Sequence, residues 1–262
     1  MTDSRLRSSP GIETPGARRL EELSLNAWPS FATHVYDGWI LRHAEGYTKR
    51  ANSVIPLYPS TIELEQKIDR SVAFYSRLGL PAIFKMTAES TPASLDAALS
   101  RRGFAIVDPS SVQIATLDSG AYAHSDGVTI ERQFSDSWFA GYAGCSRLED
   151  PARRMTAHRL LSLVPAPLVV AQMSIGGRIV SCGFAAIERE QVGIFDIVTD
   201  PEFRRRGFAE AIVRTLMRNA ALLGARTAYL QVIVANRGAQ ALYEKLGFAE
   251  RYRYWYRVSA TS

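Results

Sequence analysis

The chain repeats one order of predicted elements around four spaced glycines, and this repeat limits the folds that it can adopt. In the second half, an apolar helical stripe ends at Gly224, and a strand and a shorter helix lead to Gly247. In the first half, Gly79 and Gly103 end two helices that flank a strand in the same way. The glycines of the two pairs are 24 and 23 positions apart, and Phe follows the second glycine of each pair. We therefore predict two copies of one fold in this chain of 262 residues.

The second half has the clearer secondary-structure signals. Apolar residues recur at helical spacing from Gly207 to Leu223, and Thr227–Val234 has the apolar, β-branched composition of a strand buried on both faces. Gly176-Gly177 is a tight-hairpin signal between two strand-like runs. The other expected elements are a strand from Val128, helices Ser135–Arg147 and Ala152–Leu163, strands Leu168–Ile175, Arg178–Ile187 and Gln191–Thr199, helix Asn236–Leu246 and strand Phe248–Val258.

The first half predicts the same order with weaker signals. Asp37-Gly38 indicates a turn, and Ser60 or Thr61 can cap a helix that runs to Leu78. The other expected elements are strands Phe31–Tyr36, Trp39–His43, Ala51–Tyr58, Pro81–Thr87 and Val112–Leu117, and helix Ser94–Arg102. The predicted fold class is α/β, with a central mixed sheet flanked by helices in each copy. We expect a flexible tail at 1–19, a first domain at 20–118, a linker at 119–127 and a second domain at 128–262.

Composition excludes several classes of protein. No apolar run reaches the ~18–20 residues of a membrane-spanning helix, and residues 1–19 lack the apolar core of a secretory signal. Two cysteines, Cys145 and Cys182, make no disulfide scaffold, and the four histidines lack metal-ligand spacing. We expect a cytoplasmic monomer or homodimer with no metal and no membrane partner. The net charge of +5 permits an anionic ligand without identifying it.

One segment has the properties of a pyrophosphate site. Asp200-Pro201 turns the chain after a strand, and three arginines, Arg204 to Arg206, then precede Gly207 and a helix. Free amides and the positive end of the dipole make a helix N-terminus an anion site. Small residues at Gly207 and Ala209 let the backbone approach phosphate oxygens closely. A solvated arginine run is the alternative, although cations are unfavourable at this end of a helix.

Two motifs here resemble the GNAT superfamily of N-acetyltransferases. R-x-x-G-x-A at Arg204–Ala209 resembles its acyl-CoA loop, and N-x-x-A-x-x-L-Y-x-x-x-G-F at Asn236–Phe248 resembles the segment after its fifth strand. The resemblance covers Val128 to Val258, whereas the first half is similar only in its order of elements. At the positions of the loop, the first half has Pro59, Ile62 and Leu64. The resemblance therefore implies a tandem fold in which only the second copy binds acetyl-CoA, as a cosubstrate.

The resemblance also implies roles for individual residues. Tyr243 would protonate the departing thiolate, a task that suits a phenol, although a core-facing aromatic is the alternative. Asn236 would contact the cofactor arm, and the side chain of Arg204 would assist at the pyrophosphate. Backbone groups would bind pantetheine at Ile197, Val198 and Thr199, and pyrophosphate at Arg205, Arg206, Gly207, Phe208 and Ala209.

The general base departs from the family pattern. Many members carry Glu on the fifth strand where this chain has Gln231, which cannot accept a proton from an ammonium group. Asp196 on the preceding strand is the best-placed substitute, and Glu188 and Glu190 are weaker candidates. Asp196 is equally well explained as a strand-end residue that orders a turn, and a water chain could also remove the proton.

The expected function is acetyl transfer from acetyl-CoA to a primary amine of a small molecule, such as an amino acid, polyamine or amino-bearing antibiotic. Direct attack in a ternary complex is favoured, because neither cysteine has an evident His partner. The alternatives are a non-catalytic acyl-CoA sensor and an acetyltransferase of protein N-termini or lysines. No recognised motif supports nucleic-acid binding.

A polar cluster in the first half has two interpretations. It could line a cleft shared with the second half, or it could be a solvated hairpin, which we slightly favour. Trp28 and Trp39 are expected in the core. The cluster consists of Arg42, Tyr47, Lys49, Arg50, Asn52 and Ser53.

Overall fold

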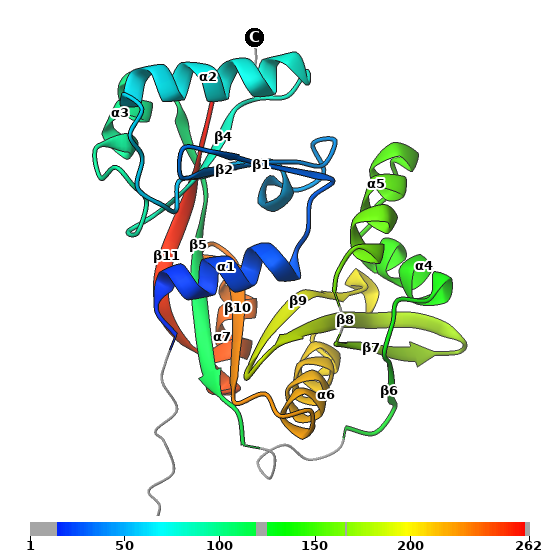
Figure 1. The fold of residues 1–262 in the computed structure, drawn as a ribbon. Coiled ribbons are helices and arrows are strands. Elements are labelled where there is room, and N and C mark those ends of the chain that lie inside the picture. Colours follow the sequence, from blue (N-terminus) through cyan, green and yellow to red (C-terminus); the bar gives the residue numbers. More distant parts are fainter. Residues whose placement is uncertain (1–14, 119–124, 166, 260–262) are drawn as a thin grey trace, which may run out of the picture.

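Eleven strands form one continuous mixed sheet in the computed structural model, which describes residues 15–118, 125–165 and 167–259 (Figure 1). The strand order is β1-β2-β3-β4-β11-β5-β10-β9-β8-β7-β6. The first half supplies α1 (Ala17–Ala27), β1 (Ala32–Tyr36), β2 (Trp39–His43), β3 (Val54–Ile55), α2 (Leu64–Arg77), β4 (Ile83–Thr87), α3 (Leu95–Arg101) and β5 (Ala105–Thr116).

The second half supplies the other strands and four α-helices. These elements are β6 (Val128–Glu131), α4 (Asp136–Cys145), α5 (Pro151–Ser162), β7 (Leu168–Ile175), β8 (Arg178–Glu188), β9 (Gln191–Thr199), α6 (Phe208–Leu222), β10 (Thr227–Ile233), α7 (Arg237–Lys245) and β11 (Ala249–Val258). Every helix and strand predicted from Val128 onward is present, with boundaries that shift by a few residues at most.

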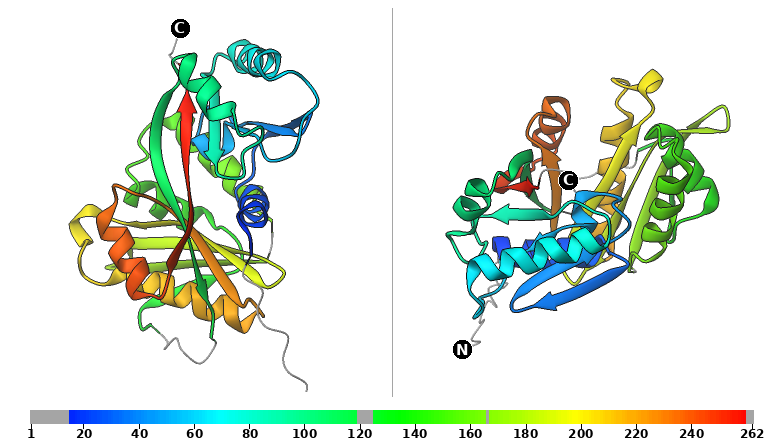
Figure 2. Two further views of the ribbon diagram at one scale, coloured as in Figure 1. Left: turned by 90° about the vertical axis from the view of Figure 1, so that its left-hand side faces the viewer. Right: turned by 90° about the horizontal axis from the view of Figure 1, so that it is seen from above.

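The two halves exchange their last strands at the centre of the sheet. β5 lies between β10 and β11 and pairs antiparallel with both, while β11 lies between β5 and β4 (Figure 2). The neighbours on either side also correspond, because β3 runs parallel to β4 and β9 runs parallel to β10. The sheet therefore continues across the predicted boundary at 119–127, and the division into two domains stays a prediction. Residues 119–124 lie outside the described part of the chain.

The four spaced glycines have the backbone conformation that ends a helix in a left-handed turn. Their φ angles are +67° at Gly79, +80° at Gly103, +94° at Gly224 and +86° at Gly247. A side chain is disfavoured in this region, which explains why glycine stands at each of these helix ends. The repeated spacing in the sequence thus corresponds to a repeated helix-to-strand connection in the structure.

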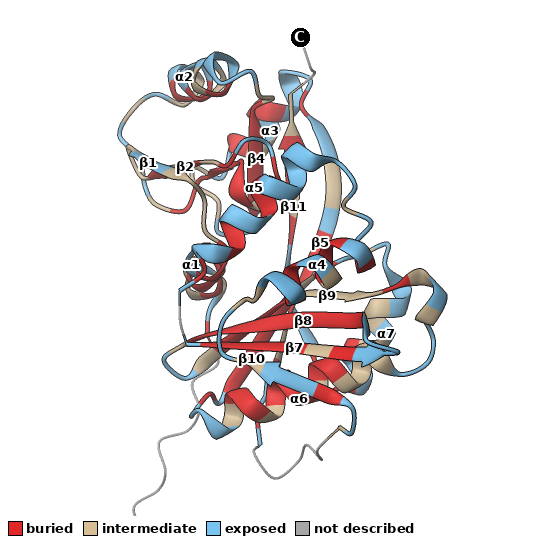
Figure 3. Ribbon diagram, turned by 90° about the vertical axis from the view of Figure 1, so that its right-hand side faces the viewer, coloured by how far each residue is buried: buried red, intermediate tan, exposed pale blue. Residues whose placement is uncertain are grey.

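Three buried clusters hold the helices on the sheet. One lies under α2 and α3 and includes Trp39 and Phe84, and a second lies under α6 and α7 and includes Leu216. The third, under α1, α4 and α5, joins both halves and contains Trp28 and Trp138. Figure 3 marks buried residues on α1 and α5 and along β8. The expectation that Trp28 and Trp39 are core residues is confirmed, since they are 2% and 0% exposed.

A buried ion pair fastens α1 across the exchanged strands. Lys85 on β4 donates to Glu21 at 2.6 Å, and the hydroxyl of Tyr252 on β11 donates to the same carboxylate at 2.6 Å. The two charged side chains are 6% and 1% exposed. Removing one partner of a buried pair typically costs about 3–5 kcal/mol, so this contact fixes the position of α1.

Two sequence predictions about helices of the first half were wrong. Residues 17–19 of the predicted tail begin α1, whose buried stripe of Leu20, Leu23 and Ala27 is too short to predict a helix clearly. The N-cap of α2 is Glu63 rather than Ser60 or Thr61: the Glu63 side chain accepts from the amide of Gln66, whereas the Thr61 hydroxyl donates to Asp37. Residues 1–14 of the tail lie outside the described part of the chain.

Two predicted strands of the first half have different lengths. β3 covers only Val54–Ile55, because Lys49–Ala51 form a 3₁₀ turn and Asn52 binds the preceding loop. β5 begins at Ala105, well before the predicted Val112, and continues through Pro109. The register of β5 with β11 shifts beside that proline, which has no amide hydrogen for the ladder.

The solvated-hairpin interpretation of the polar cluster was also wrong. Arg42, Asn52 and Ser53 are 3%, 3% and 0% exposed. Arg42 donates to backbone carbonyls, including that of Arg50 at 3.0 Å, and Asn52 Oδ1 accepts from the amides of Ala44 and Gly46. These side chains therefore build a rigid loop rather than a solvated surface. In the described part of the chain, no helix combines the length and the apolar character that crossing a membrane requires.

The strand exchange predicts that the halves stay together after the chain is cut. A protein cleaved once within residues 119–127 should elute as one species in size-exclusion chromatography under native conditions. The physical reason is that β5 is hydrogen-bonded to both β10 and β11, which lie beyond the cut. The two fragments should separate in denaturant, and separation in native buffer would contradict the exchanged arrangement.

Candidate active site

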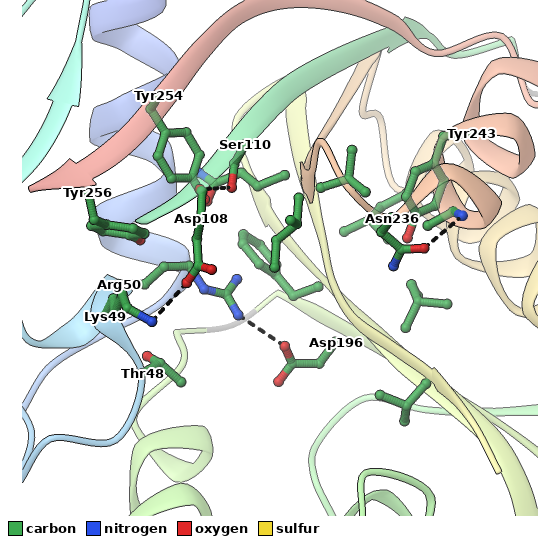
Figure 4. Close-up of a pocket in the computed structure, with 18 residues that line it drawn as sticks. Thr48, Lys49, Arg50, Asp108, Ser110, Asp196, Asn236, Tyr243, Tyr254 and Tyr256 are labelled. Atoms are coloured by element: carbon green, nitrogen blue, oxygen red, sulfur yellow. Dashed lines mark hydrogen bonds and ion pairs between the residues drawn. The ribbon is translucent and has the colours of Figure 1, made fainter. Parts of the chain in front are cut away.

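Two cavities share lining residues where β9 and β10 separate, and together they define the candidate site. One has a volume of about 350 Å³ and lies at the start of α6, and the other has about 450 Å³ and lies between the two halves. Ile197, Ala239 and Tyr243 line both cavities, so they mark the point where the cavities join. The larger one, the inter-half cleft, is drawn in Figure 4.

The cleft exists because β9 and β10 separate. Their parallel pairing ends at Ile194 and Leu230, although β9 continues to Thr199 and β10 to Ile233. A bulge in β9 places Asp196 at a φ of +49°, where the register with β8 shifts opposite Gly183. A Cβ on Gly183 would lie 2.3 Å from Ile197 Cδ1, so glycine there makes room for the bulged strand. Of the strand residues predicted to bind pantetheine, Ile197 and Val198 line the cleft, and Ile197 and Thr199 line the smaller cavity.

The start of α6 has unused hydrogen-bond donors. Gly207 has a φ of +80° and precedes the helix, and no described residue accepts a hydrogen bond from the amides of Gly207, Phe208 or Ala209. All three of these residues line the smaller cavity. An anion there would receive several amide donors and the favourable end of the helix dipole.

Three exposed arginines surround these amides without ion-pair partners among the described residues. Arg204 and Arg205 line the smaller cavity, whereas Arg206 stacks on the Phe203 ring at 5.0 Å and lies outside the lining. Arg204 also reaches the carbonyl oxygen of Thr199 at 3.4 Å. The structure thus brings two of the three predicted side chains to the cavity.

Tyr243 projects from α7 to the junction of the cavities. It is 9% exposed, packs edge-to-face against Phe248, and its hydroxyl forms no hydrogen bond with a described residue. Burial, together with a smaller contribution from the nearby Asp196 carboxylate, raises the pKa of Tyr243 to about 12. The phenol is therefore a neutral proton donor across the physiological pH range.

Asn236 begins α7 and lines the inter-half cleft. Its Oδ1 accepts from the amide of Ala239 at 3.1 Å, so the side chain caps the helix that carries Tyr243. The amide nitrogen of the Asn236 side chain makes no hydrogen bond with a described residue, which leaves it available to a ligand.

Asp196 lies in the cleft with two protein partners. Arg50 Nη2 donates to Oδ1 at 3.1 Å, and the Tyr142 hydroxyl donates to Oδ2 at 2.9 Å. The side chain of Asp196 is 11% exposed. The side chain is thus held in one orientation by one residue of each half, rather than ordering a turn at the strand end.

Gln231 occupies the fifth-strand position of the missing glutamate and also lines the cleft. Its Nε2 donates to Ser24 at 3.0 Å, and its Oε1 accepts from Tyr254 at 3.1 Å. The amide therefore links β10 to α1 and β11. The weaker base candidates lie elsewhere: Glu188 accepts from Arg19 and Asn26, and Glu190 pairs with Arg226, and neither lines the cleft.

The first half contributes a wall of the cleft that the sequence did not predict clearly. Lys49 pairs with Asp108 at 2.8 Å, and Arg50 stacks on the Trp28 ring at 4.3 Å. Figure 4 shows Arg50 pointing toward Asp196 from this wall. The sequence named Lys49 and Arg50 only as part of an uncertain cluster. No signal in the sequence indicated that five further residues line the cleft: Thr48, Asp108, Ser110, Tyr254 and Tyr256.

Comparison with known proteins agrees with this arrangement. Residues 14–257 match the family described as "Probable histone acetyltransferase Rv0428c C-terminal". The chain is similar to the uncharacterized N-acetyltransferase YobR of Bacillus subtilis, with 26% identity over 252 residues, which are 92% of this chain and 98% of the relative. The chain belongs to this family, and with it to the GNAT superfamily of N-acetyltransferases.

Two solved structures share the fold over nearly the whole chain. A GCN5-related N-acetyltransferase from Kribbella flavida aligns with a TM-score of 0.72 and 16% identity, covering 95% of this chain and 98% of its own. A tandem GNAT protein from the clavulanic acid biosynthesis pathway aligns with a TM-score of 0.56 and 14% identity, covering 93% and 88%. The mixed α/β fold with its central mixed sheet is therefore that of GNAT structures.

The environment of Tyr243 predicts its ionisation. In an alkaline titration followed by phenolate absorbance, the difference between the wild type and Tyr243→Phe should show half-ionisation near pH 12, because the buried site disfavours the charged phenolate. An exposed tyrosine ionises near pH 10. A Tyr243-dependent signal at that ordinary pH would contradict the buried environment described here.

Proposed function

We propose that the protein transfers an acetyl group from acetyl-CoA to a primary amine that enters the cleft between its two halves. One observation carries this proposal: the cavity with free amides and arginines at the start of α6 joins the inter-half cleft at Tyr243. The proposed path of the cosubstrate therefore begins at the anion site of α6, passes between the separated strands β9 and β10, and ends at the proton donor Tyr243.

The residues present fit acetyl-CoA as a cosubstrate. The amides of Gly207 to Ala209 would hold the pyrophosphate, with Arg204 and Arg205 as charged donors beside them. The backbone of Ile197 to Thr199, left unpaired on the side facing β10, would bind pantetheine as a further strand does. The amide group of Asn236 would contact the same arm. Acetyl-CoA supplies an activated acyl group as its thioester.

Proton movement would use the two titratable groups near the junction. Asp196 would accept a proton from the incoming ammonium group, so that the neutral amine can attack the thioester carbon. The C–S bond breaks as the C–N bond forms, and Tyr243 donates its hydroxyl proton to the leaving sulfur. The nitrogen of the new amide releases its second proton to solvent, so that the complete reaction liberates one proton. Solvent returns a proton to Tyr243 and takes the one held by Asp196. Both residues line the cleft, which satisfies the need for positioning.

A tandem organisation agrees with the order of the sheet. We propose that the first half is a second GNAT-like copy without the phosphate loop, and that the copies exchange their last strands. The corresponding pairings of β4 with β11 and of β10 with β5 support this, as does the similarity to a tandem GNAT protein. In this arrangement the first copy serves as the acceptor-side wall.

A small molecule is the proposed acceptor, because both halves wall a cleft of about 450 Å³. A protein amine is the second candidate, since the family description names a histone acetyltransferase. Thiol release from acetyl-CoA, measured with a panel of small amines and with lysine-containing peptides, discriminates the two. Tight acetyl-CoA binding without turnover on any amine would favour the acyl-CoA sensor instead.

The phosphate site predicts the effect of Gly207→Glu. The added carboxylate would stand among the free amides and repel a pyrophosphate, so acetyl-CoA binding measured by calorimetry should be lost. Gly103→Glu is a matched control, because Gly103 has the same φ of +80° and open space around its Cα. Strong binding by folded Gly207→Glu would contradict the assignment of the loop.

The proton donor predicts the effect of Tyr243→Phe. This variant should lower kcat by at least about 100-fold, the usual contribution of a positioned acid, and should change the Kd of acetyl-CoA little. Tyr58→Phe is the control, since Tyr58 lies outside both cavities and donates only to Glu22. An unchanged kcat for Tyr243→Phe would remove the phenol from the mechanism.

A further inference from the structure

The acceptor side of the cleft carries an arginine with unused donors. Arg50 Cζ lies over the Trp28 ring, 4.3 Å from its centroid, and this contact helps to hold the guanidinium group in place. Of its side-chain nitrogens, only Nη2 donates to a described residue, and the acceptor is Asp196 Oδ1 at 3.1 Å. The other two nitrogens, Nε and Nη1, are not fully buried, and the side chain as a whole is 25% exposed. Arg50 therefore lines the cleft with donors that no described residue uses.

The charges around Arg50 are balanced in pairs. Arg50 faces Asp196, and beside them Lys49 faces Asp108 at 2.8 Å. No other charged side chain lines the inter-half cleft in the described part of the chain. Uncharged polar residues, among them Thr48, Ser110, Gln231 and Asn236, make up the rest of the polar lining. A ligand with a positive and a negative charge could pair with Asp196 and Arg50. A plain ammonium ion would pair with Asp196 alone and leave Arg50 without a negative partner of its own.

We propose that the acceptor is a small amino acid-like zwitterion, whose amine faces Asp196 and whose carboxylate binds Arg50. This inference rests on the proposed function and names the class of its acceptor. A guanidinium group binds a carboxylate through paired N–H donors, and such charge-assisted contacts are among the strongest polar contacts in proteins. Because the first half supplies Arg50, it selects the substrate of the second half.

The carboxylate would also assist the proton transfer. When Asp196 accepts the ammonium proton, it becomes neutral, and Arg50 loses the negative partner that it has in the free protein. A guanidinium group that is only 25% exposed is costly to leave without a counter-charge. The carboxylate of the acceptor replaces that partner at the moment of transfer, whereas a simple amine leaves Arg50 unpaired. The acceptor carboxylate therefore stabilises the protonated state of Asp196.

The test compares acceptors that differ only at the carboxylate. Thiol release from acetyl-CoA is measured with the standard α-amino acids, with their α-carboxamides and with the corresponding decarboxylated amines. For the best amino acid, we expect a kcat/KM about 30- to 100-fold above that of its carboxamide and its amine, the usual effect of a hydrogen bond to a charged group. Calorimetry should show the same preference in acceptor binding.

Variants of Arg50 connect this preference to the residue. Arg50→Met should bring the amino acid down to the level of its carboxamide, and Arg50→Lys should keep part of the preference, since it retains the charge without the fork of donors. Arg19→Met is the matched control, because Arg19 also forms an ion pair between the halves, with Glu188 at 2.9 Å, and lines neither cavity. This control should retain the wild-type preference.

The outcomes separate the two proposals. Equal kcat/KM for the amino acid, its carboxamide and its amine would overturn the zwitterion inference and leave acetyl transfer intact, as would a preference that survives in folded Arg50→Met. Turnover on peptide lysines alone would likewise exclude a small zwitterion. Acetyl-CoA binding without turnover on any acceptor would instead overturn the proposed function, and the inference with it.

Discussion

The antiparallel pairing of β5 with both β10 and β11 is the constraint on which the rest of the structure depends. It places β5 of the first half between two strands of the second, and on the far side of β10 the pairing of β9 with β10 ends at Ile194 and Leu230. The same pairing brings Arg50 of the first half against Asp196 of the second. The cleft is therefore a property of the joined sheet rather than of either half alone.

Much of this fold follows from local patterns of apolar residues and turn residues in the sequence, and those parts were predicted. The strands Leu168–Ile175 and Gln191–Thr199 have the predicted bounds, because a buried strand between turn signals needs no distant partner to be identified. Gly207 and Tyr243 were named from sequence motifs, and both line the smaller cavity. What failed depends on partners that are remote in the sequence. β5 was predicted too short because its first residues are stabilised by β11, and Arg50 was undervalued because Asp196 is 146 positions away.

The proposed function divides recognition between the halves. The second half has free amides at the start of α6 and a neutral phenol whose pKa is about 12. The first half supplies side chains that line the inter-half cleft, among them Lys49 and Arg50. Under the proposal, the cosubstrate would bind to the second half and the acceptor between the two halves.

A crystal structure of the protein with acetyl-CoA tests the central claim most directly. We expect the pyrophosphate to bind the amides of Gly207 to Ala209. The thioester sulfur should lie within hydrogen-bond reach of the Tyr243 hydroxyl, and the acetyl group should face Asp196 and Arg50 across the inter-half cleft. Pyrophosphate bound elsewhere, or a thioester that points away from this cleft, would contradict this claim.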